Sequence, residues 1–176
     1  MYRTLALSVL AALVLVSHTS VASAQALDKE SKIKSALSAA PAEIAKNATV
    51  VDWNQVVLHE GGNGWVCLPD GGNGPMCLDE AWLNWAHAWI TQQKPSVDKV
   101  GLAYMLAGGK DASNTDPFAT EPAPGEDWII SGPHVMILVP DPSMLDLLPN
   151  DPKSGGPYVM FRGTPYAHIM MPVGSD

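Results

Sequence analysis

A repeated eight-residue segment with one cysteine in each copy is the feature that most constrains how this chain can fold. Residues 61–68 have the sequence GGNGWVCL, and residues 71–78, ten positions later, have the sequence GGNGPMCL. Each Gly-Gly-Asn-Gly run can take the positive φ angles of a tight turn, so the segment is predicted to form two turns followed by equivalent cysteines. We therefore expect a disulfide between Cys67 and Cys77.

A disulfide needs an oxidising compartment, and the first residues of the chain indicate one. Arg3 is followed by an apolar stretch over 5–16 and then by the small residues that a signal peptidase recognises. The pattern predicts a signal peptide over 1–24, cleaved after Ala24 or, as the second choice, after Ala26. The protein is then exported, either to a periplasm or out of the cell.

The charge of the chain excludes several classes of partner. The formal net charge is −8, and loss of Arg3 with the leader makes it −9. An acidic chain without a basic cluster repels phosphate backbones and anionic lipid, so we expect neither nucleic-acid binding nor adhesion to a membrane surface. After the leader, no stretch reaches the roughly 18 apolar residues of a membrane-spanning helix, so no span is expected in the mature chain.

The remaining residues fit one domain. Their number is near the commonest domain size, and six tryptophans among many aliphatic residues favour a packed core. Residues 25–48 are predicted to form an N-terminal helical segment, broken near Pro41, and residues 49–176 the main α+β body of the same domain.

A tryptophan-rich helix is predicted in the middle of the chain. Asp79 can cap a helix that runs over about 80–92, in which Trp82, Trp85 and Trp89 recur near helical spacing. Such a stripe either packs in the core or forms a groove on which a small ligand stacks.

Most other regular segments are predicted to be strands. Segments rich in β-branched and aromatic residues lie at 49–58, 99–106, 128–130, 134–139, 158–161 and 167–173. Residues 163–165 turn the last two strands into a hairpin, and 108–125 form a long polar loop. Helices followed mostly by strands predict an α+β fold: an antiparallel sheet with the tryptophan-rich helix packed on one face and one short disulfide loop.

Three further segments carry a resemblance. Residues 101–106 (GLAYML), 113–117 (SNTDP) and 163–170 (GTPYAHIM) resemble segments of a family of small exported bacterial proteins without assigned function. The resemblance covers most of the mature chain and implies a periplasmic or secreted setting. It implies no catalytic residues.

A His-x-Met pair that occurs twice is the most specific chemical pattern. His134 and Met136, and likewise His168 and Met170, are two residues apart in predicted strands, so each pair shares one face of its strand. Imidazole and thioether together suit copper, above all Cu(I), so the two pairs predict a metal site if their strands are neighbours. The alternative is that these residues fill the core.

An enzymatic hypothesis uses the long loop instead. Asp116, Glu121 or Asp127 supplies a carboxylate and His134 carries the proton in an acid-base hydrolysis. The chain has neither a Gly-x-Ser-x-Gly nor a His-Glu-x-x-His motif, and paired cysteines leave no thiol nucleophile.

The sequence therefore favours a non-enzymatic exported domain that binds a small ligand, a metal such as copper, or an envelope protein. The first alternative is a small periplasmic hydrolase. The second is a structural protein of the envelope that has no pocket and acts through contacts with a partner.

Overall fold

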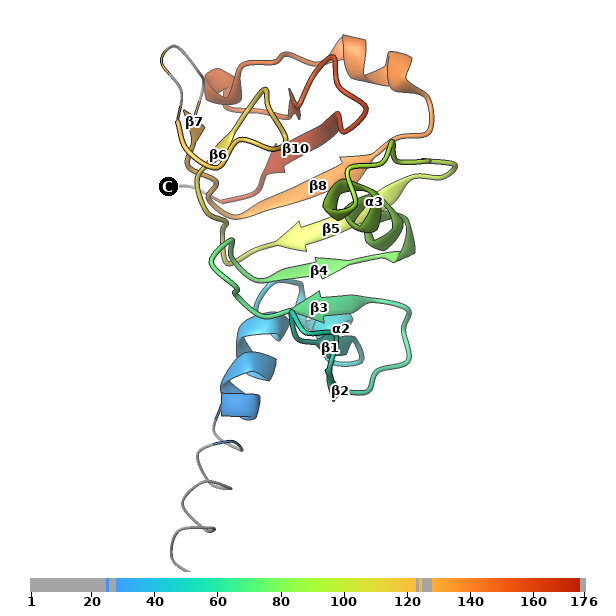
Figure 1. The fold of residues 1–176 in the computed structure, drawn as a ribbon, viewed down its shortest axis with the longest axis vertical. Coiled ribbons are helices and arrows are strands. Elements are labelled where there is room, and N and C mark those ends of the chain that lie inside the picture. The colour runs from blue at the N-terminus through green and yellow to red at the C-terminus, as the bar shows by residue number, and fades with distance from the viewer. Residues whose placement is uncertain (1–24, 26–27, 123, 125–127, 175–176) are drawn as a thin grey trace, which may run out of the picture.

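The main element of the structure is one twisted sheet, with one helix on one face and the N-terminal helical segment against one end of the other (Figure 1). The computed structural model describes residue 25 and residues 28–122, 124 and 128–174. The sheet has eight strands in the order β2-β1-β3-β4-β5-β8-β10-β9. Its strands are β1 (Thr49–Val51), β2 (Val57–His59), β3 (Val66–Leu68), β4 (Met76–Leu78), β5 (Gly101–Met105), β8 (His134–Leu138), β9 (Tyr158–Met160) and β10 (His168–Pro172). The predicted α+β fold is confirmed.

Neighbouring strands of the sheet are antiparallel, with one exception. Strands β1 and β3 are parallel, whereas β3-β4, β4-β5, β5-β8, β8-β10 and β10-β9 are antiparallel. The expected hairpin between the last two strands is present, and Gly163 takes a φ of 81° in its turn. Within the loop after β5, β6 (Ala112–Ser113) pairs with β7 (Trp128–Ile129) as a separate two-stranded sheet.

One predicted strand is two strands in the structure. The prediction of a single strand over 49–58 was wrong, because a turn after Asp52 divides this segment into β1 and β2. The Asp52 carboxylate accepts hydrogen bonds from the backbone amides of Asn54 and Val56, and Gln55 takes a φ of 64°. An aspartate that bonds to the backbone two residues on favours a turn over an extended strand. The β-branched residues around it concealed this signal.

The tryptophan-rich helix α3 (Glu80–Ile90) covers one face of the sheet (Figure 1). Asp79 caps it as predicted, because one carboxylate oxygen accepts a hydrogen bond from the amide of Trp82 at 2.9 Å. The other oxygen accepts one from the amide of Leu102 on β5 at 2.6 Å. The same side chain therefore starts the helix and fixes it to the sheet. The core beneath the helix consists of Leu78, Ala81, Trp82, Trp85, Ala103, Leu138, Tyr158, Met160, Phe161, Tyr166 and Met170.

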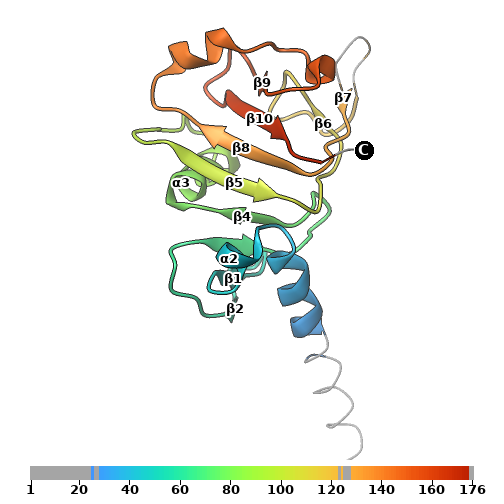
Figure 2. The same cartoon turned by 180° about the vertical axis from the view of Figure 1, so that it is seen from behind.

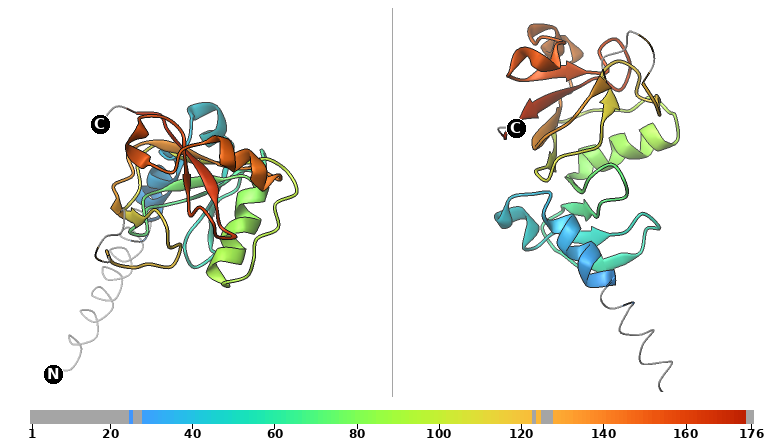
Figure 3. Two further views of the ribbon diagram at one scale, coloured as in Figure 1. Left: turned by 90° about the horizontal axis from the view of Figure 1, so that it is seen from above. Right: turned by 90° about the vertical axis from the view of Figure 1, so that its left-hand side faces the viewer.

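The N-terminal segment packs against the end of the opposite face that β1, β3 and β4 form, as the view from behind shows (Figure 2). A helix over 28–37 is followed by Pro41 and the short helix α2 (Ala42–Ala45), so the predicted break at the proline is confirmed. This layer presents small alanine side chains to the sheet, and together they form the second core: Ala36, Ala39, Ala40, Ala48, Val50, Cys67 and Cys77. Seen edge-on, the helix over 28–37 and α3 lie on opposite sides of the sheet (Figure 3).

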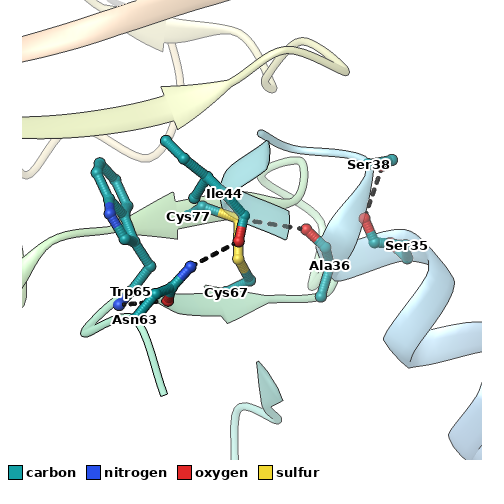
Figure 4. Close-up of a disulfide and its surroundings, with 8 residues drawn as sticks. All are labelled: Ser35, Ala36, Ser38, Ile44, Asn63, Trp65, Cys67 and Cys77. Atoms are coloured by element: carbon teal, nitrogen blue, oxygen red, sulfur yellow. Dashed lines mark hydrogen bonds between the residues drawn. A yellow bond between two sulfur atoms is a disulfide. The ribbon is translucent and has the colours of Figure 1, made fainter. Parts of the chain in front are cut away.

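The expected disulfide joins Cys67 on β3 to Cys77 on β4 (Figure 4). The two cysteines are register partners, and both are completely buried in the second core. The Cys77 sulfur lies 3.6 Å from the carbonyl oxygen of Ala36 in the N-terminal helix. Asn63, in the first turn, donates to the carbonyl of Ile44. The repeat thus holds the hairpin to the N-terminal layer.

A strap of two short 3-10 helices, η1 (Pro142–Leu147) and η2 (Pro152–Ser154), connects β8 to β9. Arg162 fixes this strap by donating to the carbonyls of Leu145 and Leu148 at 2.9 and 2.7 Å. Among the described residues, no helix is both long enough and apolar enough to cross a membrane.

Candidate functional site

The two His-x-Met pairs lie on neighbouring strands. Strands β8 and β10 are antiparallel, and Met136 and Met170 are register partners. Residues directly opposite each other in a sheet point to the same face. Because residues two apart on one strand also share a face, His134 and His168 point to the side of the two methionines. That side is the one covered by α3, since Met170 belongs to the core beneath the helix.

Two more methionines extend this set, and the sequence did not reveal them. Met105 on β5 is the register partner of His134, and Met160 on β9 is the register partner of His168. Three cross-strand pairs therefore follow one another on one face: Met105 with His134, Met136 with Met170, and Met160 with His168. We call these six residues the His/Met row. The alternation of faces along β5 and β9 could have shown on which face each methionine lies. Only the pairing of the strands, however, places the two methionines opposite histidines.

The row passes obliquely across the sheet, so the two imidazoles lie on either side of the central methionine pair. His134 is paired with Pro172 across β10, two positions beyond the Met136–Met170 pair, whereas His168 is two positions before Met170. Both His-x-Met pairs are thus on adjacent strands, but the two histidines are not side by side. By register, the central methionine pair therefore has one imidazole on each side, two strand residues away.

His168 is the more deeply buried imidazole. Its exposed fraction is 2%, and its ring is packed edge-on against the indoles of Trp82 and Trp85, with ring centroids 5.1 and 5.4 Å away. The ring of Phe161 lies 5.5 Å away. The Nδ1 atom is 3.0 Å from the carbonyl oxygen of Tyr166. A carbonyl can only accept, so Nδ1 carries the proton and the lone pair is on Nε2.

The Nε2 atom of His168 is buried and has no hydrogen-bond partner. Buried polar atoms are nearly always satisfied, so an orphaned acceptor in the core needs an explanation. A metal ligand is one, because ligating histidines are commonly oriented by a hydrogen bond from the other ring nitrogen. Burial also lowers the pKa of His168 to about 4, so the ring is neutral at neutral pH and its lone pair is available.

His134 has the same local geometry at the other end of the row. Its exposed fraction is 4%, and Nδ1 lies 2.7 Å from the carbonyl oxygen of Gly132. Burial lowers its pKa as well, although the hydrogen bond to Gly132 opposes that effect. Both histidines therefore hold their Nδ1 proton against the carbonyl two residues earlier and direct Nε2 away from the backbone.

The tryptophan stripe packs in the core. Trp82 and Trp85 are only 2% and 6% exposed, and their rings contact each other with centroids 4.9 Å apart. Trp89 lies nearer the surface, stacks on Trp85, and donates its indole N–H to the carbonyl of Pro117. The stripe thus joins the sheet to the long loop, and a ligand stacking on Trp82 or Trp85 has to enter the core. Both of these indole nitrogens are buried without a partner.

The carboxylates of the hydrolase hypothesis lie in the loop after β5. Asp116 is exposed and accepts a hydrogen bond from the amide of Phe118, which makes it a turn residue. Glu121 is also exposed, and Asp127 lies outside the described residues. The structure therefore gives Asp116 a role within its own turn, and none of the hydrogen bonds among the described residues joins Asp116 or Glu121 to His134, whose Nδ1 is bonded to Gly132.

The donor set of the His/Met row differs from that of common zinc and calcium sites. Within the described residues, no three His, Cys, Asp or Glu side chains come together in a way that could hold a metal ion. The row instead combines thioethers with neutral imidazoles. Comparison with known proteins adds no assignment: no family model, no curated protein and no solved structure matches the chain. The fold and the row define the protein as an α+β domain in which histidine and methionine side chains lie together on one face of the sheet.

Proposed function

We propose that this protein is an exported domain that binds Cu(I), with Met136, Met170 and His168 as ligands. The observation that carries the proposal is that Met136 and Met170 are register partners on one face of β8 and β10, where His168, whose Nε2 is orphaned, lies two residues before Met170. Thioether sulfur and neutral imidazole nitrogen are the donors that suit Cu(I) in proteins. Met136 is half-buried and Met170 is buried, so the site lies beneath α3 rather than on the surface.

The surroundings favour a singly charged ion over a doubly charged one. The site is packed with the indoles of Trp82 and Trp85 and the ring of Phe161. The cost of bringing an ion into such an apolar environment rises steeply with its charge, and none of the three ligands is anionic. Cu(II), Zn(II) or Ca(II) would therefore leave a large uncompensated charge in the core, whereas Cu(I) leaves a smaller one.

Export is the second part of the proposal. The leader-like segment over 1–24 and the resemblance to small exported bacterial proteins support a setting outside the cytoplasm. The disulfide between Cys67 and Cys77 agrees with this setting, since such bonds persist in oxidising compartments. Thioether ligands suit that environment because, unlike thiolates, they are not consumed by disulfide formation.

The test is a binding titration of residues 25–176 with Ag(I), a redox-inert analogue of Cu(I), and with Cu(I) in competition with a chromophoric chelator. We expect one ion bound in the buried site, with quenching of tryptophan fluorescence. Replacement of both methionine ligands, by Met136→Leu and Met170→Leu, is expected to weaken the binding of the ion by about ten-fold or more. Leucine nearly conserves the volume of methionine, so the fold should be retained.

Matched controls are present in the same chain. Met171 follows Met170 on β10 but alternates to the opposite face, where its register partner is Val135. Met144 is exposed on η1. Met171→Leu and Met144→Leu should therefore bind as the wild type does. Absence of binding by the wild-type protein, or undiminished binding by a variant carrying Met136→Leu, Met170→Leu and His168→Phe, overturns the proposal.

A further inference from the structure

The outer end of the His/Met row lies beside a surface hollow. The hollow has a volume of about 330 Å³ and is formed by two loops, the second turn of the glycine repeat and the turn after β5. Backbone hydrogen bonds hold these loops together, since the amide of Lys110 donates to the carbonyl of Asn73, and that of Gly109 to the carbonyl of Ser131. Asp70 and Lys110 contribute one charge of each sign to the lining.

Gly109 separates this hollow from the first pair of the row. It lines the hollow, and a Cβ atom placed on it would lie 3.2 Å from the terminal methyl carbon of Met105 and 3.5 Å from Cε1 of His134. Because glycine has no side chain, these two side chains approach the backbone of Gly109 closely, as does the carbonyl oxygen of Asn73, which would lie 3.4 Å from the same Cβ atom. His134 itself is 4% exposed, so the pair is covered but lies just below the surface.

The donors that follow are closely spaced along the sheet. From His134 the row continues two residues along β8 to Met136, crosses to its register partner Met170, and continues two residues along β10 to His168. Register partners have Cβ atoms about 5 Å apart, and residues two apart on a strand are separated by about 7 Å. The largest step between successive residues of the row is therefore two strand residues.

We propose that the Met105–His134 pair is the entry station through which Cu(I) passes from the hollow at Gly109 to the buried site. This inference rests on the proposed function. His134 suits the role because its Nδ1 proton is fixed by Gly132, which leaves Nε2 as an electron-pair donor. Met105 supplies a thioether at the partner position. Two donors bind Cu(I) more weakly than the three donors of the inner site, so the ion moves inward.

The consequence is kinetic and differs from that of losing an inner ligand. Replacement of an entry residue should slow loading but leave the final affinity nearly unchanged, because the ion ends at Met136, Met170 and His168. A side chain added at Gly109 should have the same effect, because its Cβ would point towards Met105 and His134.

The experiment is stopped-flow mixing of the protein with Ag(I), followed by tryptophan fluorescence, alongside an equilibrium titration of the same variants. We expect His134→Leu and Gly109→Leu to reduce the loading rate about ten-fold or more, with an affinity that stays within about three-fold of the wild type. Gly109→Ala is the milder variant if leucine disturbs the fold, since its nearest neighbour is the mobile end of Met105. Gly156→Leu is the control, because a Cβ there meets nothing within 4 Å.

Two results overturn the entry station while leaving the proposed function in place. One is loading at the wild-type rate in both His134→Leu and Gly109→Leu. The other is a loss of affinity in His134→Leu as large as that in the Met136→Leu, Met170→Leu variant, which would make His134 a permanent ligand. Failure of the wild-type protein to bind Ag(I) at all overturns the proposed function and this inference together.

Discussion

Cys67 and Cys77 stand directly opposite each other on β3 and β4, with their Cα atoms 4.0 Å apart. The disulfide therefore joins two residues that the sheet register already pairs, and it lies in the core under the N-terminal helix. A bond of this kind adds little to the definition of the folded state. Its main effect is on the unfolded chain, whose freedom it restricts.

Reduction of this disulfide is expected to lower the melting temperature. The two cysteines are ten residues apart in the sequence, and closing a loop of that length stabilises a fold by about 3 kcal/mol in the chain-entropy model. Thermal denaturation with and without reductant measures the effect, provided that free thiols are counted before each melt. The variant with Cys67→Ala and Cys77→Ala is the control, and its melting temperature should not respond to reductant. An unchanged melting temperature in fully reduced wild-type protein contradicts the prediction.

The glycines of the repeat have two different roles, of which the sequence reveals one. Gly64 and Gly74, the fourth residues of the two runs, take φ angles of 81° and 85°, as expected for tight turns. Gly61 and Gly71, the first residues, are needed because other groups pack against them. A Cβ on Gly61 would lie 2.3 Å from the backbone carbonyl carbon of Ala48. This approach depends on how the N-terminal layer packs, which no local pattern predicts.

Two neighbouring glycines therefore provide a matched pair of substitutions. Gly61→Ala forces the backbone at Ala48 to move and should lower the free energy of unfolding by about 1–3 kcal/mol or more. At Gly62 the nearest group to an added Cβ is the Asn47 side chain at 3.5 Å. Gly62→Ala should change stability by less than about 1 kcal/mol. Urea denaturation of the two variants measures the difference. Equal stabilities would show that the close approach of the Ala48 backbone does not exclude a side chain at position 61.

Features that depend on residues close together in the sequence were predicted well, whereas those that depend on contacts between distant strands were not. The Asp79 cap, the break at Pro41 and the pairing of each histidine with the methionine two residues later follow from local geometry. The neighbourhood of β8 and β10 does not, because strand order depends on the packing of the whole sheet. Met105 and Met160 were missed for the same reason, although each lies opposite a histidine.

Asp79 is expected to contribute more to stability than an ordinary helix cap. Loss of a helix cap alone costs about 1 kcal/mol of stability. Asp79→Ala also leaves the part-buried amide of Leu102 without its acceptor, so the total loss should be about 2–3 kcal/mol. Asp79→Asn separates the two effects, since its amide oxygen can still cap Trp82 but its NH₂ group cannot accept from Leu102. Urea denaturation should place the asparagine variant between the wild type and the alanine variant. Equal losses in the two variants would contradict the double role.

The stability of the domain should fall as the pH is lowered towards 4, because His168 is buried in its neutral form. Burial lowers the pKa of His168 from 6.5 to about 4, so the unfolded chain takes up a proton at a higher pH than the folded one does. The contribution is complete above about pH 6.5 and is lost as the pH falls towards the folded pKa. A shift of this size corresponds to about 3 kcal/mol when the loss is complete. The pKa of His134 is lowered in the same direction and adds to the effect.

The pH dependence can be assigned to His168 by substitution. His168→Phe keeps an aromatic ring between Trp82, Trp85 and Phe161 but cannot take up a proton, so its stability should vary less between pH 6.5 and pH 4 than that of the wild type. His87→Gln alters an exposed residue of α3 and should keep the wild-type profile. Denaturant unfolding at a series of pH values provides the measurement. Two results would contradict the prediction: a wild-type stability profile that is flat across this interval, or one that His168→Phe leaves unchanged. Either would mean that the imidazole takes up a proton within the core at little cost. The proposal of a neutral nitrogen ligand at this position would then lose its physical basis.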